Sequence, residues 1–343
     1  MLGRSCLIAA LLLGAAAAPS RAQDVRSPTL DAVKQRGQLV CGVDTGIPGY
    51  AFQDSGGNWK GLDVALCRAL ADAVLGDPNK VKFVGLTSQV RFTVLKGGEI
   101  DVLIRDSEHT FVRNTQLGLA EPVVNFYTGQ GFMVRKSLNV STVKQLDGAT
   151  ICLETGTTLE KNIADYNQIA HVKIGTLLFD RPEQAFAAAE AGRCDGYTDD
   201  AGSVAAARSS MKKPDEWSVL GETISRSVLG PYTREGDENW TKLVKWTHYA
   251  MLEGEVLGLT RANVAAAKQS PSEDPSQRKF LGVEGGFGKM LGVDDDWSFR
   301  IIRDVGNYGE IYDEFFGPKG LGLPRGMNSL WTQGGLQIPP PWY

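Results

Sequence analysis

Apolar and polar positions follow the same order in two halves of the chain. Leu39 to Val43 is a short apolar run, typical of a buried strand, and Ala149 to Leu153 is a second run of this kind. In each half an acidic residue, a threonine and a glycine follow the run. A helix is expected next, and in Leu62 to Val74 the apolar residues recur at the spacing of one helical face.

The correspondence continues further along each half. Phe92 precedes Gly98 by six residues, and Asp101 follows that glycine by three. The same intervals recur in the second half, at Phe186, Gly192 and Asp195. A glycine at this place is typical of a helix C-terminus, and a strand is predicted after it. The repeated order of strand, two helices and strand predicts two α/β lobes with mostly parallel sheets.

Two extended segments, Gly129 to Val134 and Ser225 to Tyr232, are expected to cross between these lobes. We therefore predict that the chain divides into residues 23–128 for the first part of lobe 1, 129–231 for lobe 2, and 232–343 for the return to lobe 1 with a C-terminal extension. Trp240 to Leu257 has the pattern of an amphipathic helix, and the remainder is expected to be rich in loops. Paired crossings leave a cleft at the carboxyl ends of the strands, the usual ligand position in open α/β sheets.

The first 22 residues have the pattern of a secretory signal peptide. Arg4 gives a positive start, and Cys6 to Ala18 form an apolar run that is too short to span a membrane. Ser20 and Ala22 place small residues before the expected cleavage point at Gln23. We therefore expect an exported protein that works in the periplasm.

Composition narrows the class of partner. The 343 residues are 42% hydrophobic and 22% charged, which is ordinary for globular domains, and the 40 glycines have no collagen-like period. The formal net charge is −4 and no dense Lys/Arg run occurs, which argues against nucleic acid and anionic membranes as partners. A small molecule is the expected partner, and we expect a monomer.

Four cysteines follow the predicted signal peptide, at positions 41, 67, 152 and 194. Four cysteines allow three pairings, and an oxidising compartment favours disulfides over free thiols. We favour Cys41–Cys67 with Cys152–Cys194, because each bond then stays within one half of the chain and the two loops have similar lengths. Four buried free thiols are the alternative.

The segment from Gly156 to Glu160 is predicted to pass from a strand through a short loop into a helix. Thr157 as N-cap with Glu160 three residues later would make a capping box. The free N–H groups of such a helix start, together with the Thr158 hydroxyl, suit an anion such as a carboxylate. For Glu160 we favour capping alone, whereas for Thr158 capping and ligand binding stay open.

Three further residues suit a small zwitterion. Thr110 can cap a helix and place Arg113 in its first turn. A positive charge at a helix N-terminus is electrostatically unfavourable, which indicates that Arg113 has a functional role there. The Arg113 guanidinium would hold a carboxylate in two hydrogen bonds, and the alternative is a surface arginine paired with Glu108 or Asp106. Asp200, which follows Asp199 past a predicted buried strand, could take an ammonium group or serve as a helix N-cap.

Catalytic and cofactor motifs are weaker. The chain has no Gly-x-Ser-x-Gly elbow, and its three histidines, at 109, 171 and 248, are far apart in sequence. Gly320-Leu-Gly322 follows no predicted strand, so it is a poor dinucleotide site. Asp294 to Asp296 lacks the alternation of a calcium loop and is expected to be a solvated turn. We therefore expect no enzyme activity, no cofactor and no metal.

With these motifs in view, the chain after the signal peptide resembles, nearly end to end, the periplasmic amino-acid-binding proteins of ABC uptake systems, and most closely the long subgroup that carries general L-amino acids. The stretches that carry the resemblance are Gly61-Leu-Asp-Val-Ala-Leu-Cys67, Arg91-Phe-Thr93, Gly98-Glu-Ile-Asp101, Gly129-Gln-Gly-Phe-Met-Val-Arg-Lys136, Gly156-Thr-Thr158, Gly192-Arg-Cys-Asp195, Val305-Gly-Asn-Tyr-Gly-Glu-Ile-Tyr312 and Arg325-Gly-Met-Asn-Ser-Leu-Trp331.

The resemblance implies a two-lobed "Venus flytrap" of the type II periplasmic-binding-protein fold, which closes on one ligand and presents it to a membrane permease. It also implies roles for single residues. Arg113 would grip the α-carboxylate with help from Thr158, and Asp200 would take the α-ammonium. A residue near Ile47 or Tyr50 would cover the ligand side chain. The cysteines of the family agree with the pairing favoured above.

One stretch departs from the family. The pattern before the arginine usually runs Ser-Arg-Asn-Thr-Thr-Trp-Thr, whereas here it runs Ile104-Arg-Asp-Ser-Glu-His-Thr110. Glu108 takes a position where a small hydroxyl helps to bind the carboxylate, and His109 replaces the tryptophan. Two anions 4 Å apart repel by about 4 kcal/mol at an effective dielectric constant near 20. Glu108 therefore turns outward, pairs with Arg113, or belongs to a site for a different ligand.

Three functions follow from these residues. The leading hypothesis is a periplasmic solute-binding protein for an amino acid or a related amine-bearing solute, whose lobes close on the ligand. The second is an enzyme of the same fold, similar to cyclohexadienyl or arogenate dehydratases, with Glu108 and His109 as acid and base. The third is a receptor that signals through a membrane sensor.

Overall fold

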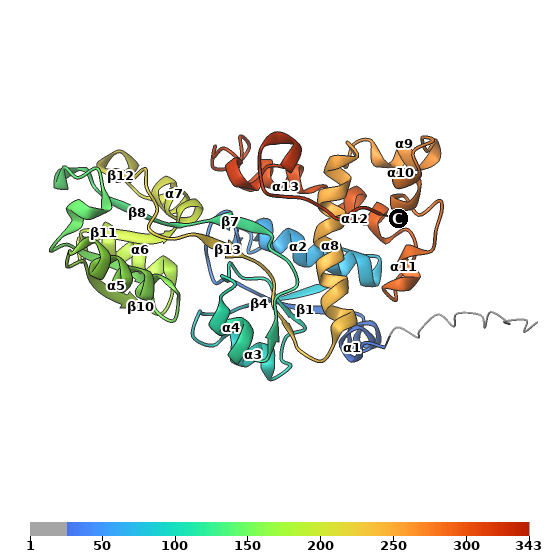
Figure 1. The fold of residues 1–343 in the computed structure, drawn as a ribbon, viewed down its shortest axis with the longest axis horizontal. Coiled ribbons are helices and arrows are strands. Elements are labelled where there is room, and N and C mark those ends of the chain that lie inside the picture. Colours follow the sequence, from blue (N-terminus) through green and yellow to red (C-terminus); the bar gives the residue numbers. More distant parts are fainter. Residues whose placement is uncertain (1–25, 343) are drawn as a thin grey trace, which may run out of the picture.

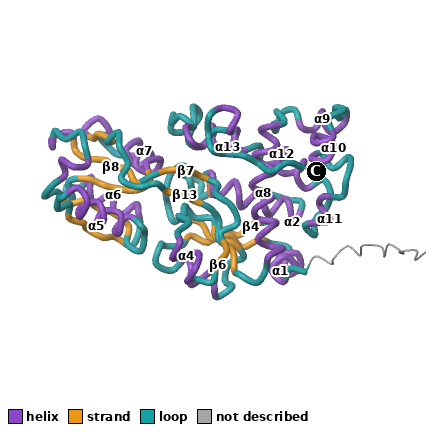
Figure 2. Tube along the Cα trace, in the orientation of Figure 1, coloured by secondary structure: helices purple, strands orange, loops and turns teal. Residues whose placement is uncertain are grey.

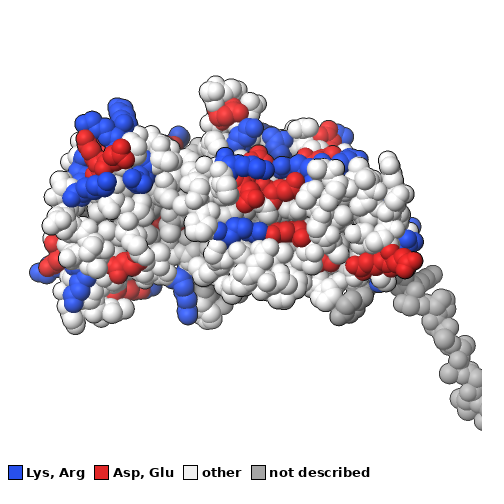
Figure 3. Space-filling model, turned by 90° about the horizontal axis from the view of Figure 1, so that it is seen from above, with Lys and Arg blue, Asp and Glu red and all other residues white. Residues whose placement is uncertain are grey.

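The computed structural model describes residues 26–342, and the predicted signal peptide lies outside this range. Two lobes of unequal size lie side by side (Figure 1), and each contains a β-sheet with helices against it. No helix in the described range is long and apolar enough to cross a membrane. On the face seen in Figure 3, acidic and basic side chains lie in neighbouring patches, with broad uncharged areas between them.

The larger lobe is built on a three-stranded parallel sheet in the order β4-β1-β5. The apolar run predicted as the first strand is β1 (Leu39–Val43), and all five of its residues are buried. Its neighbours are β4 (Val81–Gly85) and β5 (Val102–Leu103). The predicted helix after β1 is α2 (Leu62–Leu75), which ends at Gly76 in the left-handed conformation. The other helices near this sheet are α1 (Pro28–Arg36), α3 (Arg91–Lys96) and α4 (Phe111–Gln116).

The smaller lobe has a five-stranded sheet in the order β10-β9-β11-β8-β12. The strand predicted at 149–153 is β9 (Thr150–Glu154). Strands β9, β10 and β11 are parallel, while β8 runs antiparallel to both β11 and β12. Hydrophobic clusters cover both faces of the sheet, one against α5 and the other against α6 and α7. These elements are β8 (Gln130–Arg135), β10 (Gly175–Phe179), β11 (Gly196–Asp200), β12 (Trp217–Val219), α5 (Leu159–Ala170), α6 (Pro182–Glu190) and α7 (Ala201–Ser210).

Two short strands join the lobes. β7 (Phe126–Thr128) and β13 (Ser227–Leu229) pair antiparallel and run between the two sheets (Figure 2). The second predicted crossing, 225–232, contains β13. The first was placed too late in the chain, because residues 130–135 form β8 inside the sheet of the smaller lobe, and the crossing is made by β7 just before them.

The chain returns to the larger lobe through α8 (Glu238–Val256), the amphipathic helix predicted from the sequence. The expectation that the remainder is rich in loops is wrong in part, because five helices follow. They are short, at most eight residues, so no long apolar period marks them. These helices are α9 (Val264–Gln269), α10 (Pro275–Phe280), α11 (Phe287–Met290), α12 (Trp297–Asp304) and α13 (Tyr308–Phe315).

The helices of this return segment complete the core of the larger lobe. Trp240 of α8, Ile301 of α12 and Tyr308 of α13 lie in one hydrophobic cluster with Leu66 of α2. Four short strands form two-stranded pairs outside the main sheets: β2 (Phe52–Gln53) with β3 (Trp59–Lys60), and β6 (Leu119–Ala120) with β14 (Thr233–Arg234).

Both predicted disulfides are present. Cys41 of β1 is bonded to Cys67 of α2, with their Cα atoms 6.2 Å apart, so this bond ties the first sheet to its helix. Cys152 of β9 is bonded to Cys194, just before β11, with a Cα separation of 5.7 Å. Each lobe therefore carries one disulfide, and neither bond restrains the movement of one lobe against the other.

Candidate functional site

A small cavity, with about 30 Å³ of space for water molecules, lies where the lobes meet. Its walls are the segments that follow β1, β4 and β5 in the larger lobe and those that follow β9 and β11 in the smaller one. The predicted cleft at the carboxyl ends of the strands is therefore where the cavity lies. Its lining residues are Ile47, Ser88, Arg91, Arg105, Asp106, Glu108, Arg113, Glu154, Thr157, Thr158, Leu159, Asp199, Asp200 and Leu229.

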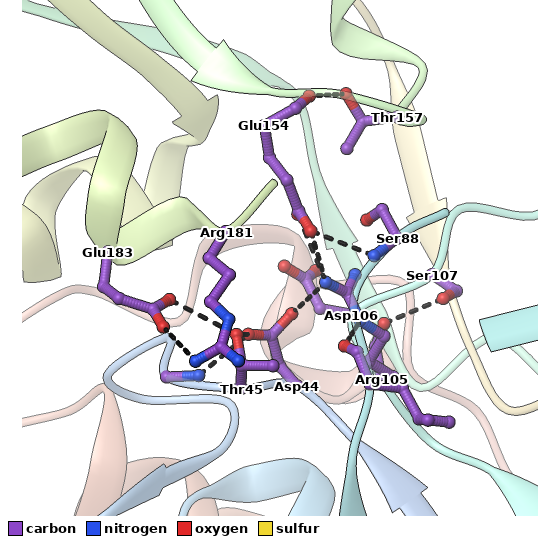
Figure 4. A network of polar contacts seen from close by, with 12 residues as sticks. Asp44, Thr45, Ser88, Arg105, Asp106, Ser107, Glu154, Thr157, Arg181 and Glu183 are labelled. Carbon is purple, nitrogen blue, oxygen red and sulfur yellow. Dashed lines mark hydrogen bonds and ion pairs between the residues drawn. The ribbon is translucent and has the colours of Figure 1, made fainter. Parts of the chain in front are cut away.

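A buried ion-pair network crosses the cavity floor between the lobes (Figure 4). Arg105 Nη2 lies 2.6 Å from Oδ2 of Asp44 in its own lobe and 2.9 Å from Oε1 of Glu154 in the other. The same Glu154 oxygen accepts a hydrogen bond from the Ser88 backbone N–H at 3.0 Å. Burial raises the pKa of Asp44 to about 6, although the positive charge of Arg105 opposes the rise. These contacts join the two lobes across the cavity.

Arg113 stands where the sequence placed it, in the first turn of α4. Thr110 is the N-cap of that helix, and its hydroxyl accepts a hydrogen bond from the Arg113 backbone N–H at 3.1 Å. The Arg113 side chain lines the cavity and donates from Nη1 to the backbone carbonyl of Glu108 at 2.8 Å. The guanidinium therefore contacts a carbonyl rather than the Glu108 carboxylate considered above. Thr110 itself is not among the cavity-lining residues.

Three aspartates meet in the cavity wall. Asp106 follows β5 in the larger lobe, whereas Asp199 and Asp200 end β11 in the smaller one, and one carboxylate oxygen from each lies within 4.8 Å of the others. Burial and the neighbouring carboxylates raise the pKa of Asp106 and of Asp200 well above the usual value. Burial also raises the pKa of Asp199, to about 7.

The loop that carries Asp106 is held in an uncommon conformation. Asp106 has a φ of +41°, and its backbone N–H donates to Oδ2 of Asp63 at 2.8 Å. Asp200 occupies the N-cap position of α7, but its side chain makes no capping hydrogen bond. The capping alternative for Asp200 is therefore not realised, and its carboxylate faces the other two. Three carboxylates, one from the larger lobe and two from the smaller, can bind a cation, either an ammonium group or a metal ion.

The loop before α5 differs from the predicted capping box by one residue. Helix α5 begins at Leu159, so Thr158 rather than Thr157 is the N-cap. The Thr157 hydroxyl accepts from the Leu159 N–H at 3.3 Å, and Glu160 reaches back to the Gly156 N–H at 3.0 Å. Because Thr158 makes no side-chain capping bond and lines the cavity, its hydroxyl is free to meet a ligand.

Of the two residues expected to cover a ligand side chain, Ile47 and Tyr50, only Ile47 lines the cavity. Ile47 lines the cavity, with Leu159 and Leu229 as further apolar wall. Tyr50 does not line it, because its ring is fully buried in the larger lobe against Phe126 and Phe316.

Glu108 lines the cavity, and its charge is among the causes that raise the pKa of Asp200. Its neighbour His109 is directed elsewhere. The imidazole packs edge-on against Tyr232, Nε2 lies 3.3 Å from the Pro231 carbonyl, and the residue is not among the cavity-lining ones. The two residues considered as acid and base therefore do not face one site.

Sequence reasoning missed Arg91, Arg105, Ser88 and Glu154 in the cavity wall. The signal that selected Arg113 was available for Arg91 as well, since Arg91 is the first residue of a helix, where a positive charge is unfavourable. Arg105 and Glu154 carry no such local signal, because their pairing depends on the approach of two lobes.

The fold and the cavity between its lobes define a solute-binding protein. The bacterial extracellular solute-binding proteins, family 3, match residues 39–269, and the chain belongs to this family. It is 46% identical to the glutamate/glutamine/aspartate/asparagine-binding protein BztA of Rhodobacter capsulatus, over 98% of this chain and 97% of that protein. It is 44% identical to the general L-amino acid-binding periplasmic protein AapJ of Rhizobium johnstonii, over 96% and 97%.

A solved structure shares the whole architecture. The ABC transporter/periplasmic binding protein from Brucella ovis with glutathione bound is 43% identical and superposes with a TM-score of 0.89, covering 92% of this chain and 99% of that one. The sequence-based assignment to the periplasmic amino-acid-binding proteins and to the two-lobed fold is confirmed.

Proposed function

We propose that this protein captures an amino acid or a related amine-bearing solute in the cavity between its lobes and delivers it, as a monomer in the periplasm, to the membrane permease of an ABC uptake system. The observation that carries the proposal is the polarity of the cavity. Arg91, Arg105 and Arg113 line it together with Asp106, Asp199 and Asp200, and both lobes contribute to the walls.

This polarity suits a zwitterion. Arg113 would hold the α-carboxylate, with the Thr158 hydroxyl as a second donor from the other lobe. The α-ammonium would lie among the three aspartates and relieve their mutual repulsion. Because each ligand group contacts residues of both lobes, the ligand would favour the closed state over the open one.

The relatives support the same reading. BztA and AapJ are named for amino acids, and the Brucella ovis protein holds glutathione, a peptide with an ammonium group and two carboxylates. The placement of His109 against Tyr232, away from the cavity, supports binding over catalysis.

The proposal is tested by calorimetric titration of ligand-stripped protein with the twenty L-amino acids and with glutathione. We expect saturable binding of at least one of them, and loss of that binding in Arg113→Ala. Arg193→Ala, which removes an exposed arginine of the smaller lobe, is the matched control and should bind normally. Unchanged affinity in Arg113→Ala would overturn the assignment of that residue. Binding of a divalent cation, with no amino acid bound, would mean that the aspartates form a metal site instead.

A further inference from the structure

The two crossing strands, β7 and β13, have an open groove on the face opposite the ligand cavity. Leu229 of β13 lines the cavity, whereas the residue before it, Val228, lines the groove. Successive side chains of a strand point to opposite faces, and Tyr127 of β7, which pairs with Val228, lines the groove as well. The groove is larger than the cavity, with about 680 Å³ of space for water molecules, and its walls are mainly apolar.

Each lobe supplies one wall of the groove. The wall of the smaller lobe is formed by the start of α7 and by Thr223. The wall of the larger lobe is formed by Tyr312 of α13 and by the C-terminal extension, through residues 323–328 and Leu336. In Figure 1, α7 and α13 mark these two walls above the crossing strands. The extension lies beyond residue 269, where the match to the family ends, so most of this second wall lies outside the segment that the family shares.

The distance between the walls depends on how far the lobes are closed. The lobes are together in this structure, since Arg105 contacts Glu154 across the cavity. A lobe that rotates about the crossing strands moves away from its neighbour on one face of those strands and toward it on the other. Opening of the cavity therefore narrows the groove, and the groove is widest when the cavity is closed.

We infer that the groove is a conformational device in which the C-terminal extension acts as a stop for the smaller lobe, so that the width of the groove sets how far the cavity opens. Of the proposed function it uses only that the lobes open and close. The apparent affinity for a ligand falls with the fraction of the protein that is in the closed state, because the ligand must supply the free energy of closure. A stop that limits opening therefore strengthens binding without touching the ligand.

The experiment places a bulky side chain in the groove. In Val228→Trp the indole has room in the wide groove of the closed state, but it obstructs the narrowed groove of the open state. We expect the ligand-free variant to have a smaller radius of gyration than the ligand-free wild type, measured by small-angle X-ray scattering. Val283→Trp is the matched control, because Val283 is 42% exposed and lines neither the groove nor the cavity.

Affinity gives a second readout, with L-glutamate, L-glutamine and glutathione as probes. We expect Val228→Trp to bind any probe that the wild type binds at least ~5-fold more tightly, because a larger fraction of the variant is closed before binding. A substitution that merely disturbs the neighbouring Leu229 would weaken binding instead. Thr223→Trp fills the groove from the exposed wall of the smaller lobe and should have the same two effects. It decides the matter if Val228→Trp does not fold, as judged by thermal unfolding.

The groove itself can be followed by the reactivity of a thiol in Val228→Cys. The four cysteines between residues 26 and 342 are all disulfide-bonded, so the introduced thiol is the one free thiol of that range. Its reaction with a maleimide should become faster when a bound probe closes the lobes and widens the groove. A thiol in Val283→Cys should react at the same rate with and without the probe.

The remaining outcomes separate the groove from the proposed function. Ligand-free Val228→Trp and Thr223→Trp that are as extended as the wild type, or that bind the probes no more tightly, would overturn the inference and leave the function intact. Slower reaction of Val228→Cys with a probe bound would also overturn it, because the groove would then narrow on closure. A wild type that binds none of the probes would count against the proposed function alone, and the scattering of the ligand-free variants would still decide the inference.

Discussion

Arg105 and Glu154 form an ion pair across the two lobes, with Nη2 and Oε1 2.9 Å apart and both side chains almost fully buried. Arg105 follows β5 in the larger lobe, and Glu154 ends β9 in the smaller one. The contact can exist only when the lobes are together, since opening the cleft would separate the two residues. In the open form Arg105 would keep Asp44, whereas Glu154 would lose both Arg105 and the Ser88 N–H.

We therefore predict that Glu154→Gln weakens ligand binding without changing the ligand preference. The closed state would lose the charge of one partner in a buried pair, and we expect about a tenfold loss of affinity, which corresponds to ~1.4 kcal/mol. Calorimetry gives the affinity, and small-angle X-ray scattering gives the ligand-dependent decrease in the radius of gyration. Glu160→Gln is the control, because Glu160 bonds only to groups of its own loop, Thr155 and Gly156. An unchanged affinity in Glu154→Gln would show that the pair does not contribute to closure.

Glu108 adds a carboxylate to the cavity wall beyond those of Glu154 and the three aspartates, and its charge acts on Asp200. Such a charge repels a second carboxylate of the ligand more than it affects a neutral side chain. We predict that Glu108→Gln raises the ratio of the glutamate affinity to the glutamine affinity by at least ~3-fold. Calorimetric titration with both ligands measures the ratio, and Glu99→Gln, which changes an exposed glutamate, should leave it unchanged. A constant ratio in Glu108→Gln would place the carboxylate in solvent rather than in the cavity.

Elements with a local signal could be predicted from the sequence. The continuous apolar run of β1 and the helical spacing of α2 are properties of consecutive residues, and so is the cap that Thr110 provides for α4. The cysteine pairing also followed, because each bond lies within one lobe. The short helices between 264 and 315 did not, since segments of four to eight residues are too short for an apolar period to stand out.

Site residues could be predicted from the sequence where the position of a single residue, such as the start of a helix, indicates its role. Arg113 and Asp200 occur at helix starts that the pattern identifies, and both line the cavity. Tyr50 was misplaced, because spacing along the chain does not determine whether a loop aromatic faces the cleft or the core behind it. The pairing of Arg105 with Glu154 arises from the contact between lobes, which no local pattern encodes.

We expect the three aspartates of the cavity wall to make ligand binding dependent on pH. Burial raises the pKa of Asp199 to about 7 and that of Asp106 and Asp200 well above the usual value, so protons are held by these carboxyls when the closed cavity contains no cation. A ligand ammonium stabilises their ionised forms and lowers their pKa, so binding releases protons.

Affinity should accordingly increase as the pH rises through the raised pKa values and decrease below them. We predict at least a tenfold weaker binding at pH 5.5 than at pH 8, measured by calorimetry in buffers of different ionisation enthalpy, which also counts the released protons. In Asp199→Asn the dependence between pH 5.5 and 8 should become shallower. An affinity that is constant over this range, with no proton release, would place the ammonium away from these aspartates.

The C-terminal extension braces one of the crossing strands. Asn328, which is 4% exposed, accepts a hydrogen bond from the Tyr127 N–H at 2.7 Å and donates to the Tyr127 carbonyl at 2.9 Å. Tyr127 is the central residue of β7, whose other edge pairs with β13. The amide side chain therefore takes the place of a neighbouring strand along the free edge of the crossing.

We predict that Asn328→Ala lowers the free energy of unfolding by about 1–3 kcal/mol, because two backbone groups of Tyr127 lose their partners. Thermal and urea unfolding of the ligand-free protein measure the effect. Met327→Ala alters the adjacent side chain, which is half exposed and has no polar contact to make with β7, and it should change stability by less than about 0.5 kcal/mol. Equal stability of Asn328→Ala and the wild type would mean that water replaces the amide at no cost and that the extension does not brace the crossing.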